Sequence, residues 1–176
     1  FPYITISDDS VTEEQNTKTG AEIFWKIDSS KQLNATFNPD FGQVESDELV
    51  VNFSATETYY SDKRPFFAEN QSMFEVQGYQ MFYVINTRRI GGAPDYNCSS
   101  FSSNLASSCS TSQKGTSDID IAIRYIQQSE ALDFGFLGAF EKDEDFSQGR
   151  DFYATKFRKT SKDFSFGYLG THVERP

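Results

Sequence analysis

Three acidic residues lie close enough in the sequence to converge on one site: Asp40, Glu45 and Asp47. Carboxylate oxygens are the ligands that Ca²⁺ prefers, and a pair of carboxylates can also divide the roles of general acid and general base. The alternative is structural, because an isolated buried carboxylate is costly and normally has a cationic partner. Three arginines could provide that partner: Arg64, Arg88 and Arg89. The first interpretation is therefore an ion-pair network that fixes this segment against a sheet, with calcium binding and catalysis as the alternatives.

Four aromatic rings surround one of these arginines in the sequence: Tyr59, Tyr60, Phe66 and Phe67. Exposed rings could stack against sugar rings or against the apolar surface of a partner. Rings clustered beside a proline, here Pro65, could equally plug the end of a sheet. Both hypotheses stay open, and the exposure of the rings decides between them.

Cys98 and Cys109 bracket a loop rich in serine and asparagine, with no Cys-x-x-Cys spacing and no clustered histidine that would indicate zinc. The pattern predicts a disulfide within an insert over residues 93–117. Closing a loop of about 12 residues stabilises the fold by roughly 3 kcal/mol in the chain-entropy model. Such a bond persists in the periplasm or outside the cell, while two free thiols are the alternative.

Other residues that could support hydrolysis are few. His172 is the only histidine, which excludes a site with several histidine ligands, and no Gly-x-Ser-x-Gly elbow is present for a Ser-His-Asp triad. The acidic run at 143–145 could supply a glycosidase carboxylate, but it is also typical of a solvated hairpin turn. We expect no catalytic residue and no cofactor within this chain.

Alternation of apolar and polar residues predicts the elements that must position these groups. Residues 21–28 and 32–38 alternate with a period of two around a turn-like link, which predicts a hairpin. Further strand-like segments follow at 80–86, 118–126, 132–142 and 163–173, the last two separated by 151–159. The alternation breaks over 48–60, which predicts a short helical or irregular, plug-like segment near 47–62. The fold class is mainly β, an antiparallel up-and-down meander that forms a barrel-like or strongly curved sheet.

Composition bounds the architecture and the partners. The 176 residues suit a single β-domain over 1–176, and 26 acids against 16 bases give a net charge of −10, which disfavours nucleic acid as a partner. No run approaches the roughly 20 apolar residues of a membrane helix. The start at FPYITIS and the stop at THVERP, both close to strand-like sequence, suggest a piece of a longer protein.

Three motifs together resemble one known family. They are residues 38–41, 43–45 and 47 (NPDF, QVE and D), residues 63–67 and 69 (KRPFF and E), and residues 88–91 (RRIG). The chain resembles the domain of unknown function that follows a family 9 carbohydrate-binding module in outer-membrane proteins of Gram-negative bacteria, some of them labelled membrane-associated hydrolases. The resemblance implies the outer membrane, periplasm or cell surface of such a bacterium. It also implies, as partners, the rest of the same polypeptide, with its upstream sugar-binding module and remaining barrel, and glycans.

Strands of about 9 to 11 residues rich in Phe and Tyr are also typical of an outer-membrane barrel wall. About seven strands are predicted here and a closed membrane barrel needs at least eight, so this chain alone would not close a pore. A self-contained soluble β-domain and a section of a larger wall both fit. We expect a non-catalytic structural or plug-and-strand region of an envelope protein linked to carbohydrate binding or uptake. A membrane-associated hydrolase fragment acting on glycans and a carbohydrate- or protein-binding module are the alternatives.

Overall fold

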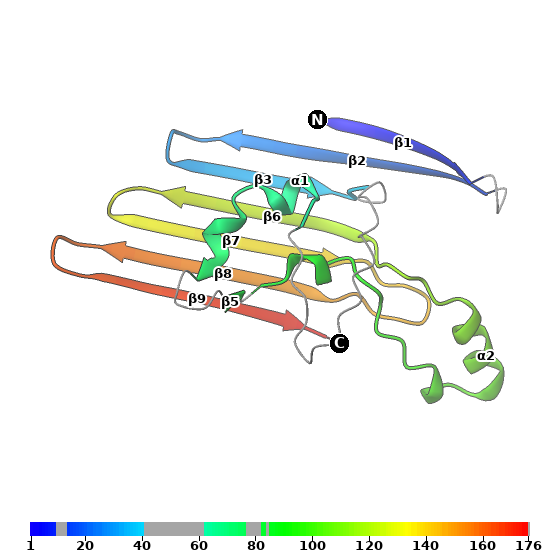
Figure 1. Ribbon diagram of the computed structural model, residues 1–176. Coiled ribbons are helices and arrows are strands. Elements are labelled where there is room, and N and C mark those ends of the chain that lie inside the picture. Colours follow the sequence, from blue (N-terminus) through cyan, green and yellow to red (C-terminus); the bar gives the residue numbers. More distant parts are fainter. Residues whose placement is uncertain (10–13, 41–61, 77–81, 84, 176) are drawn as a thin grey trace.

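The computed structural model describes residues 1–9, 14–40, 62–76, 82–83 and 85–175. Seven strands form one antiparallel sheet in the order β1-β2-β3-β6-β7-β8-β9 (Figure 1). They are β1 (Pro2–Asp9), β2 (Glu14–Lys26), β3 (Lys31–Phe37), β6 (Ile119–Gln128), β7 (Leu132–Glu141), β8 (Asp151–Thr160) and β9 (Ser165–Glu174). Each strand pairs with the next strand of the sheet along the chain, so the predicted up-and-down meander is confirmed. The sheet stays open, with β1 and β9 as its edges.

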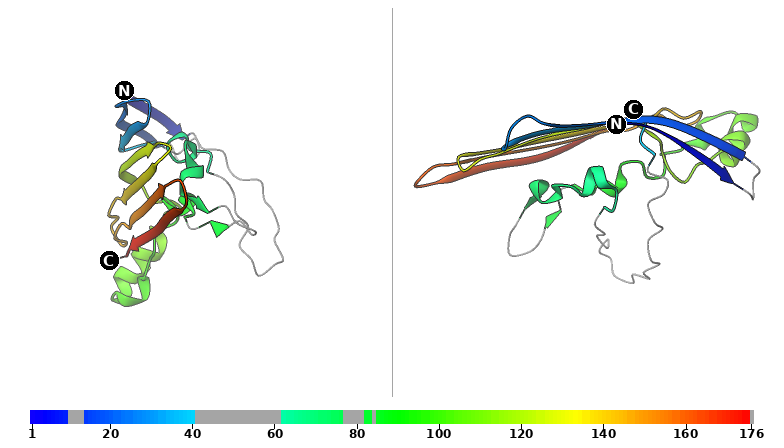
Figure 2. Two further views of the ribbon diagram at one scale, coloured as in Figure 1. Left: turned by 90° about the vertical axis from the view of Figure 1, so that its left-hand side faces the viewer. Right: turned by 90° about the horizontal axis from the view of Figure 1, so that it is seen from above.

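The connection from β3 to β6 carries the smaller elements of the described chain: α1 (Pro65–Ala68), η1 (Gln71–Phe74), β4 (Glu75–Val76), β5 (Phe82–Tyr83), η2 (Thr87–Arg89), η3 (Cys98–Ser100) and α2 (Ser103–Thr111). We call its described residues from 62 to 92 the inner segment. Figure 2 shows the inner segment along one face of the sheet, whereas α2 lies beyond the end of the sheet. Among the described residues, no helix is long and apolar enough to span a membrane.

The core lies between the inner segment and the covered face of the sheet. The sheet contributes Ile119, Ala122, Ile126, Leu137, Ala139, Phe152 and Ala154, and the inner segment contributes Phe66, Phe67, Met73, Phe74 and Ile90. Gly135 permits this close approach, because a Cβ at that position would lie 2.9 Å from Met73 Cγ. Phe66 and Phe67 pack edge to face, with ring centroids 5.0 Å apart.

The opposite face of the sheet, which we call the outer face, is apolar and is not covered by any described residue. Successive side chains of a strand alternate between faces, and the pairing register aligns Trp25, Leu33, Tyr125 and Phe136 in one row. Trp25 is 57% exposed, Ile4 71% and Tyr168 59%. Large apolar side chains that a soluble domain normally buries therefore face away from the core.

Several segments differ from the sequence-based predictions. The separator at 151–159 is itself a strand, β8, and the strand predicted at 80–86 has only β5 among its described residues. The insert at 93–117 contains the helix α2, in which the Ser108 and Ser110 hydroxyls donate to the carbonyl oxygens of Asn104 and Ala106 one turn earlier. The helical or irregular segment predicted at 48–60 lies outside the described residues.

Candidate functional site

Buried polar residues gather where the inner segment meets the sheet. The first group joins two parts of the inner segment: Arg64 Nη2 donates to Asp62 Oδ2 over 2.6 Å and to the Thr87 carbonyl oxygen over 2.7 Å. Arg64 Nη1 donates to the Ile90 carbonyl oxygen over 2.7 Å. Both members of the ion pair are buried. Arg64 thus ties the turn before α1 to η2.

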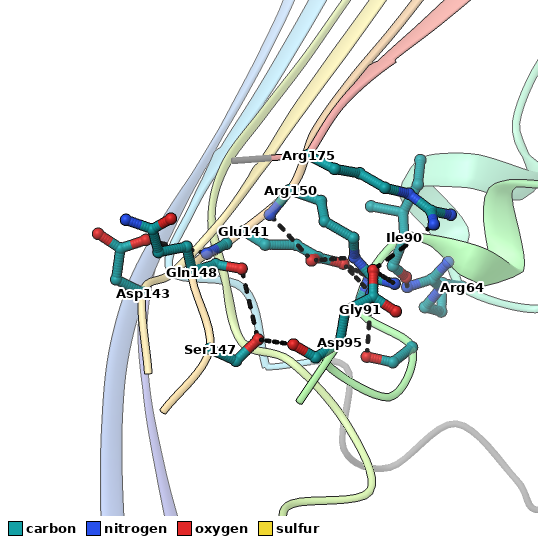
Figure 3. Close-up of polar contacts among 12 residues, drawn as sticks. Arg64, Ile90, Gly91, Asp95, Glu141, Asp143, Ser147, Gln148, Arg150 and Arg175 are labelled. Carbon is teal, nitrogen blue, oxygen red and sulfur yellow. Dashed lines mark hydrogen bonds and ion pairs between the residues drawn. The ribbon is translucent and has the colours of Figure 1, made fainter. Parts of the chain in front are cut away.

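The second group fixes the end of the inner segment to the sheet (Figure 3). Glu141, buried at the end of β7, accepts from Arg150 Nε over 2.8 Å and from Arg150 Nη2 over 2.9 Å. It also accepts the backbone N–H of Gly91 over 2.8 Å. The hydrogen bond to Glu141 raises the pKa of Arg150. Gly91 has a φ of +76°, a conformation that few other residues adopt, so the turn that presents this N–H favours glycine.

The third group lies at the middle of the covered face. Arg124, 2% exposed on β6, donates to the carbonyl oxygens of Phe66 and Glu69 and to the Glu69 carboxylate. Asn34 and Gln32 of β3 donate to the same carboxylate over 2.9 and 3.2 Å. Burial lowers the pKa of Arg124, and Glu69 opposes that shift. The guanidinium therefore holds the end of α1 against the sheet.

These contacts occupy the carboxylates that could otherwise do chemistry. Asp62, Glu69 and Glu141 are each held by an arginine, and Glu141 also accepts a backbone N–H. No group of three or more potential metal ligands occurs in the described part of the chain. The arrangement is suited to holding two layers together rather than to acid–base catalysis.

The chain matches the model of the domain of unknown function DUF5916 over residues 1–151. It belongs to the DUF5916 family. No curated protein and no solved structure matches the chain.

The structure of this DUF5916 chain locates part of the predicted site. Asp40 is half-buried, and its backbone N–H donates to Tyr3 Oη over 3.2 Å. Arg64 pairs with Asp62, while Arg88 and Arg89 lie on η2. Four of the predicted residues lie outside the described part of the chain: Glu45, Asp47, Tyr59 and Tyr60. A network that joins the three acids to the three arginines, and its calcium alternative, thus remain predictions.

The two described members of the predicted aromatic cluster have a packing role. Phe66 and Phe67 are 8% and 3% exposed and belong to the core of the DUF5916 domain. Arg124 lies over the ring of Phe66 and Arg64 over that of Phe67, at 5.2 and 4.3 Å from the ring centroids. These two rings therefore carry cation–π contacts inside the protein, and neither presents its face to a ligand from solvent.

The predicted disulfide between Cys98 and Cys109 is confirmed, and it joins η3 to α2. The acidic run at 143–145 lies in the hairpin between β7 and β8, where Asp143 accepts the backbone N–H of Gly149 over 2.9 Å. His172 stacks on Tyr153 of the neighbouring strand, with ring centroids 6.1 Å apart. Beside this hairpin is a cleft of about 340 Å³, lined in part by Asp95, Phe101, Phe146, Arg150 and Arg175.

Five charged residues of the site were missed by sequence reasoning: Arg124 within β6, Glu141 and Arg150 at the ends of β7 and β8, and Asp62 and Glu69 on either side of α1. Arg124 carried a usable signal, because it lies between the apolar Ala122 and Ile126 on one side of a strand whose other side is Ile121, Ile123 and Tyr125. A buried arginine on a strand whose other side carries an exposed isoleucine, Ile121, is unusual for a soluble sheet. The same charge is expected on the inner face of a sheet whose outer face contacts lipid.

Proposed function

We propose that this DUF5916 domain is a section of the wall of an outer-membrane barrel, with the inner segment packed on its lumen side. In this proposal its role is structural and non-catalytic, within an envelope protein linked to carbohydrate binding or uptake. The observation that carries the proposal is that the uncovered face of the sheet is apolar, whereas the buried charges of the strands, Arg124, Asp133 and Glu141, lie on the covered face beside the core. The link to carbohydrate rests on the resemblance to chains that follow a sugar-binding module.

The distribution of charge on the outer face supports contact with lipid. On this face of the described strands β2, β3 and β6 to β9, the charged residues lie toward strand ends: Lys31, Asp151, Lys159 and Glu174. Asp151 and Lys159 bound a stretch of β8 that spans roughly 27 Å at about 3.4 Å per residue. A strand tilted by about 40° then crosses a charge-free band about 21 Å tall, close to the roughly 25 Å apolar band of outer-membrane barrels.

The band is also oblique to the strands. One row across the sheet contains Phe37, Ile121, Phe140, Asp151 and Glu174. The row continues through Ala21 of β2 to Pro2 of β1. Exposed Ile4 of β1 lies two residues from this row on one side, and exposed Tyr168 of β9 lies six residues from it on the other side. That offset is about 27 Å along the strands, across six strand spacings that cover about 29 Å. The band therefore slants by roughly 40°, which matches the strand tilt of membrane barrels.

The inner face has the character of a lumen. Asn34, Thr36, Arg124 and Asp133 point to this side and are buried beneath or beside the inner segment. Arg158 Nη2 lies 2.5 Å from Asp133 Oδ2 on the same face. Polar interiors filled by a folded segment occur in membrane barrels, because lipid takes the apolar side chains on the outside.

A charge placed in the middle of the outer face tests this proposal. Thr155 lies midway between Asp151 and Lys159 on β8, on the outer face. In lipid, Thr155→Arg should lower the free energy of unfolding by about 2–4 kcal/mol, whereas the matched Thr155→Val should be neutral or stabilising. On a water-exposed face both substitutions should stay within about 0.5 kcal/mol of the parent.

The measurement has two parts. The complete gene product is expressed in a Gram-negative host and fractionated, and denaturant unfolding of each variant is then followed in lipid vesicles. Recovery of the parent protein in the outer-membrane fraction, with the arginine variant alone destabilised, supports the proposal. Recovery in the soluble fraction, or equal stability of the arginine and valine variants, refutes it.

A further inference from the structure

The two ends of the sheet differ in the connections that they carry (Figure 1). At one end the strands are joined by tight turns over residues 27–30, 129–131 and 161–164. The opposite end carries the connections over residues 10–13, 38–118 and 142–150, and the second of these, the longest, contains α2. We call these the tight-turn end and the long-connection end.

The tight turns are closed by their own residues. Asp28 accepts from the backbone N–H and the hydroxyl of Ser30, over 2.7 and 2.8 Å. The Ser129 hydroxyl contacts both the backbone N–H and the carbonyl oxygen of Leu132, at 3.1 and 2.9 Å. Each of these turns is only three or four residues long and carries no helix. By contrast, the long-connection end carries a helix joined by a disulfide to η3, and a cleft of about 340 Å³ lies beside its hairpin over residues 142–150.

Resting on the proposed function, we propose that the long-connection end faces the outside of the cell and that the tight-turn end faces the periplasm. Outer-membrane barrels have short periplasmic turns and longer extracellular loops, and the asymmetry here is of that kind. The disulfide between Cys98 and Cys109 would then staple a helix on the cell surface, and an extracellular ligand would reach the cleft beside Arg150 without crossing the membrane.

Two single-cysteine variants of the complete gene product test this orientation. Gly115 at the long-connection end is exposed, and a Cβ there would meet nothing within 4 Å. Glu130 in the tight turn between β6 and β7 is also exposed. The probe is a maleimide joined to a polyethylene glycol too large for outer-membrane pores, applied to intact cells and to cells with a permeabilised outer membrane. The parent, whose described cysteines are disulfide-bonded, provides the background.

Labelling of Gly115→Cys in intact cells, with labelling of Glu130→Cys at least tenfold higher after permeabilisation than before, is the expected result. The reverse pattern overturns the orientation, as does labelling of both variants or of neither in intact cells. Both variants are also checked for recovery in the outer-membrane fraction and for parental stability. A protein that is absent from that fraction refutes the wall proposal itself, so the two failures are distinguishable.

Discussion

Arg124 holds the inner segment on the sheet, so its removal should release that segment before the sheet unfolds. The substitution Arg124→Met keeps a long, flexible side chain but removes every donor. The carbonyl oxygens of Phe66 and Glu69 lose their charged donor, and the Glu69 carboxylate loses its ion-pair partner. Asn34 and Gln32 still donate to that carboxylate, which limits the loss.

The stability lost in Arg124→Met can be estimated from the buried hydrogen bonds that Arg124 makes. A lost hydrogen bond from a charged donor costs about 1.5–3 kcal/mol, and two carbonyl oxygens are affected. The ion pair itself adds little, because the Glu69 side chain is 44% exposed and solvent screens the interaction. Since the methionine regains some packing, we expect a net loss of about 3 kcal/mol, which is roughly a hundredfold change in the opening equilibrium of the inner segment.

Amide hydrogen exchange measures this opening directly. The backbone N–H groups of Phe67, Ala68 and Glu69 donate to the carbonyl oxygens of Arg64 or Pro65, so they report on α1. They should exchange about a hundred times faster in Arg124→Met, while amides in the middle of β7 change little. Lys18→Met is the matched control, because it removes a partly exposed cation that pairs with Asp118 and should change exchange less than tenfold. Equal exchange of the α1 amides in the two variants would refute the reasoning.

Two further predictions concern turns. A Cβ on Gly149 would lie 2.1 Å from the Glu141 carbonyl oxygen, so Gly149→Ala should lower the free energy of unfolding by about 1–3 kcal/mol. The control, Gly115→Ala, places its Cβ in open space and should be neutral. Equal melting temperatures of the two variants would contradict this prediction. The Ser30 hydroxyl, the Ser30 backbone N–H and Lys31 lower the pKa of Asp28 from 3.8 to about 2, so the stability that this contact contributes is present above about pH 4 and is lost as the pH falls through about 2. NMR titration should show that midpoint in the parent and a higher one in Ser30→Ala, and an unchanged midpoint would show that the hydroxyl is not the main cause.

Much of the sheet could be predicted because its signal is local. The alternation around Trp25, Ile123 and Phe136 repeats every second residue, which fixes strand type and which residues share a face. Cys98 and Cys109 were predictable as a pair because they lie in one short loop. The strand β8 was missed because Thr155 and Lys156 weaken the apolar alternation of residues 151–159.

The polar contacts between the layers could not be predicted, because they join residues far apart in the chain. Arg124 meets Glu69 across 55 residues, and Gly91 meets Glu141 across 50. No sequence period marks such pairs, and a lone glutamate such as Glu69 resembles any solvated surface residue. The sequence predicts Arg64 as an ion-pair residue, but its described partner, Asp62, lies only two positions away and is not among the predicted acids.

A strand that alternates with a period of two buries its apolar side in a soluble sheet but exposes that side to lipid in a membrane barrel. The side on which the buried charges lie distinguishes the two cases. In water, a period of two places apolar residues inside, so the row of Ile123 and Tyr125 should be covered and Arg124 exposed. The structure has the reverse: Arg124 is 2% exposed, whereas Ile121 on the other face is 39% exposed. Burying an arginine with its donors satisfied gains little over an apolar residue in a soluble core, so stability in water does not account for this arrangement. The proposed place in a barrel wall accounts for it, because there lipid would solvate the isoleucines and the inner face would be the side where charges pair.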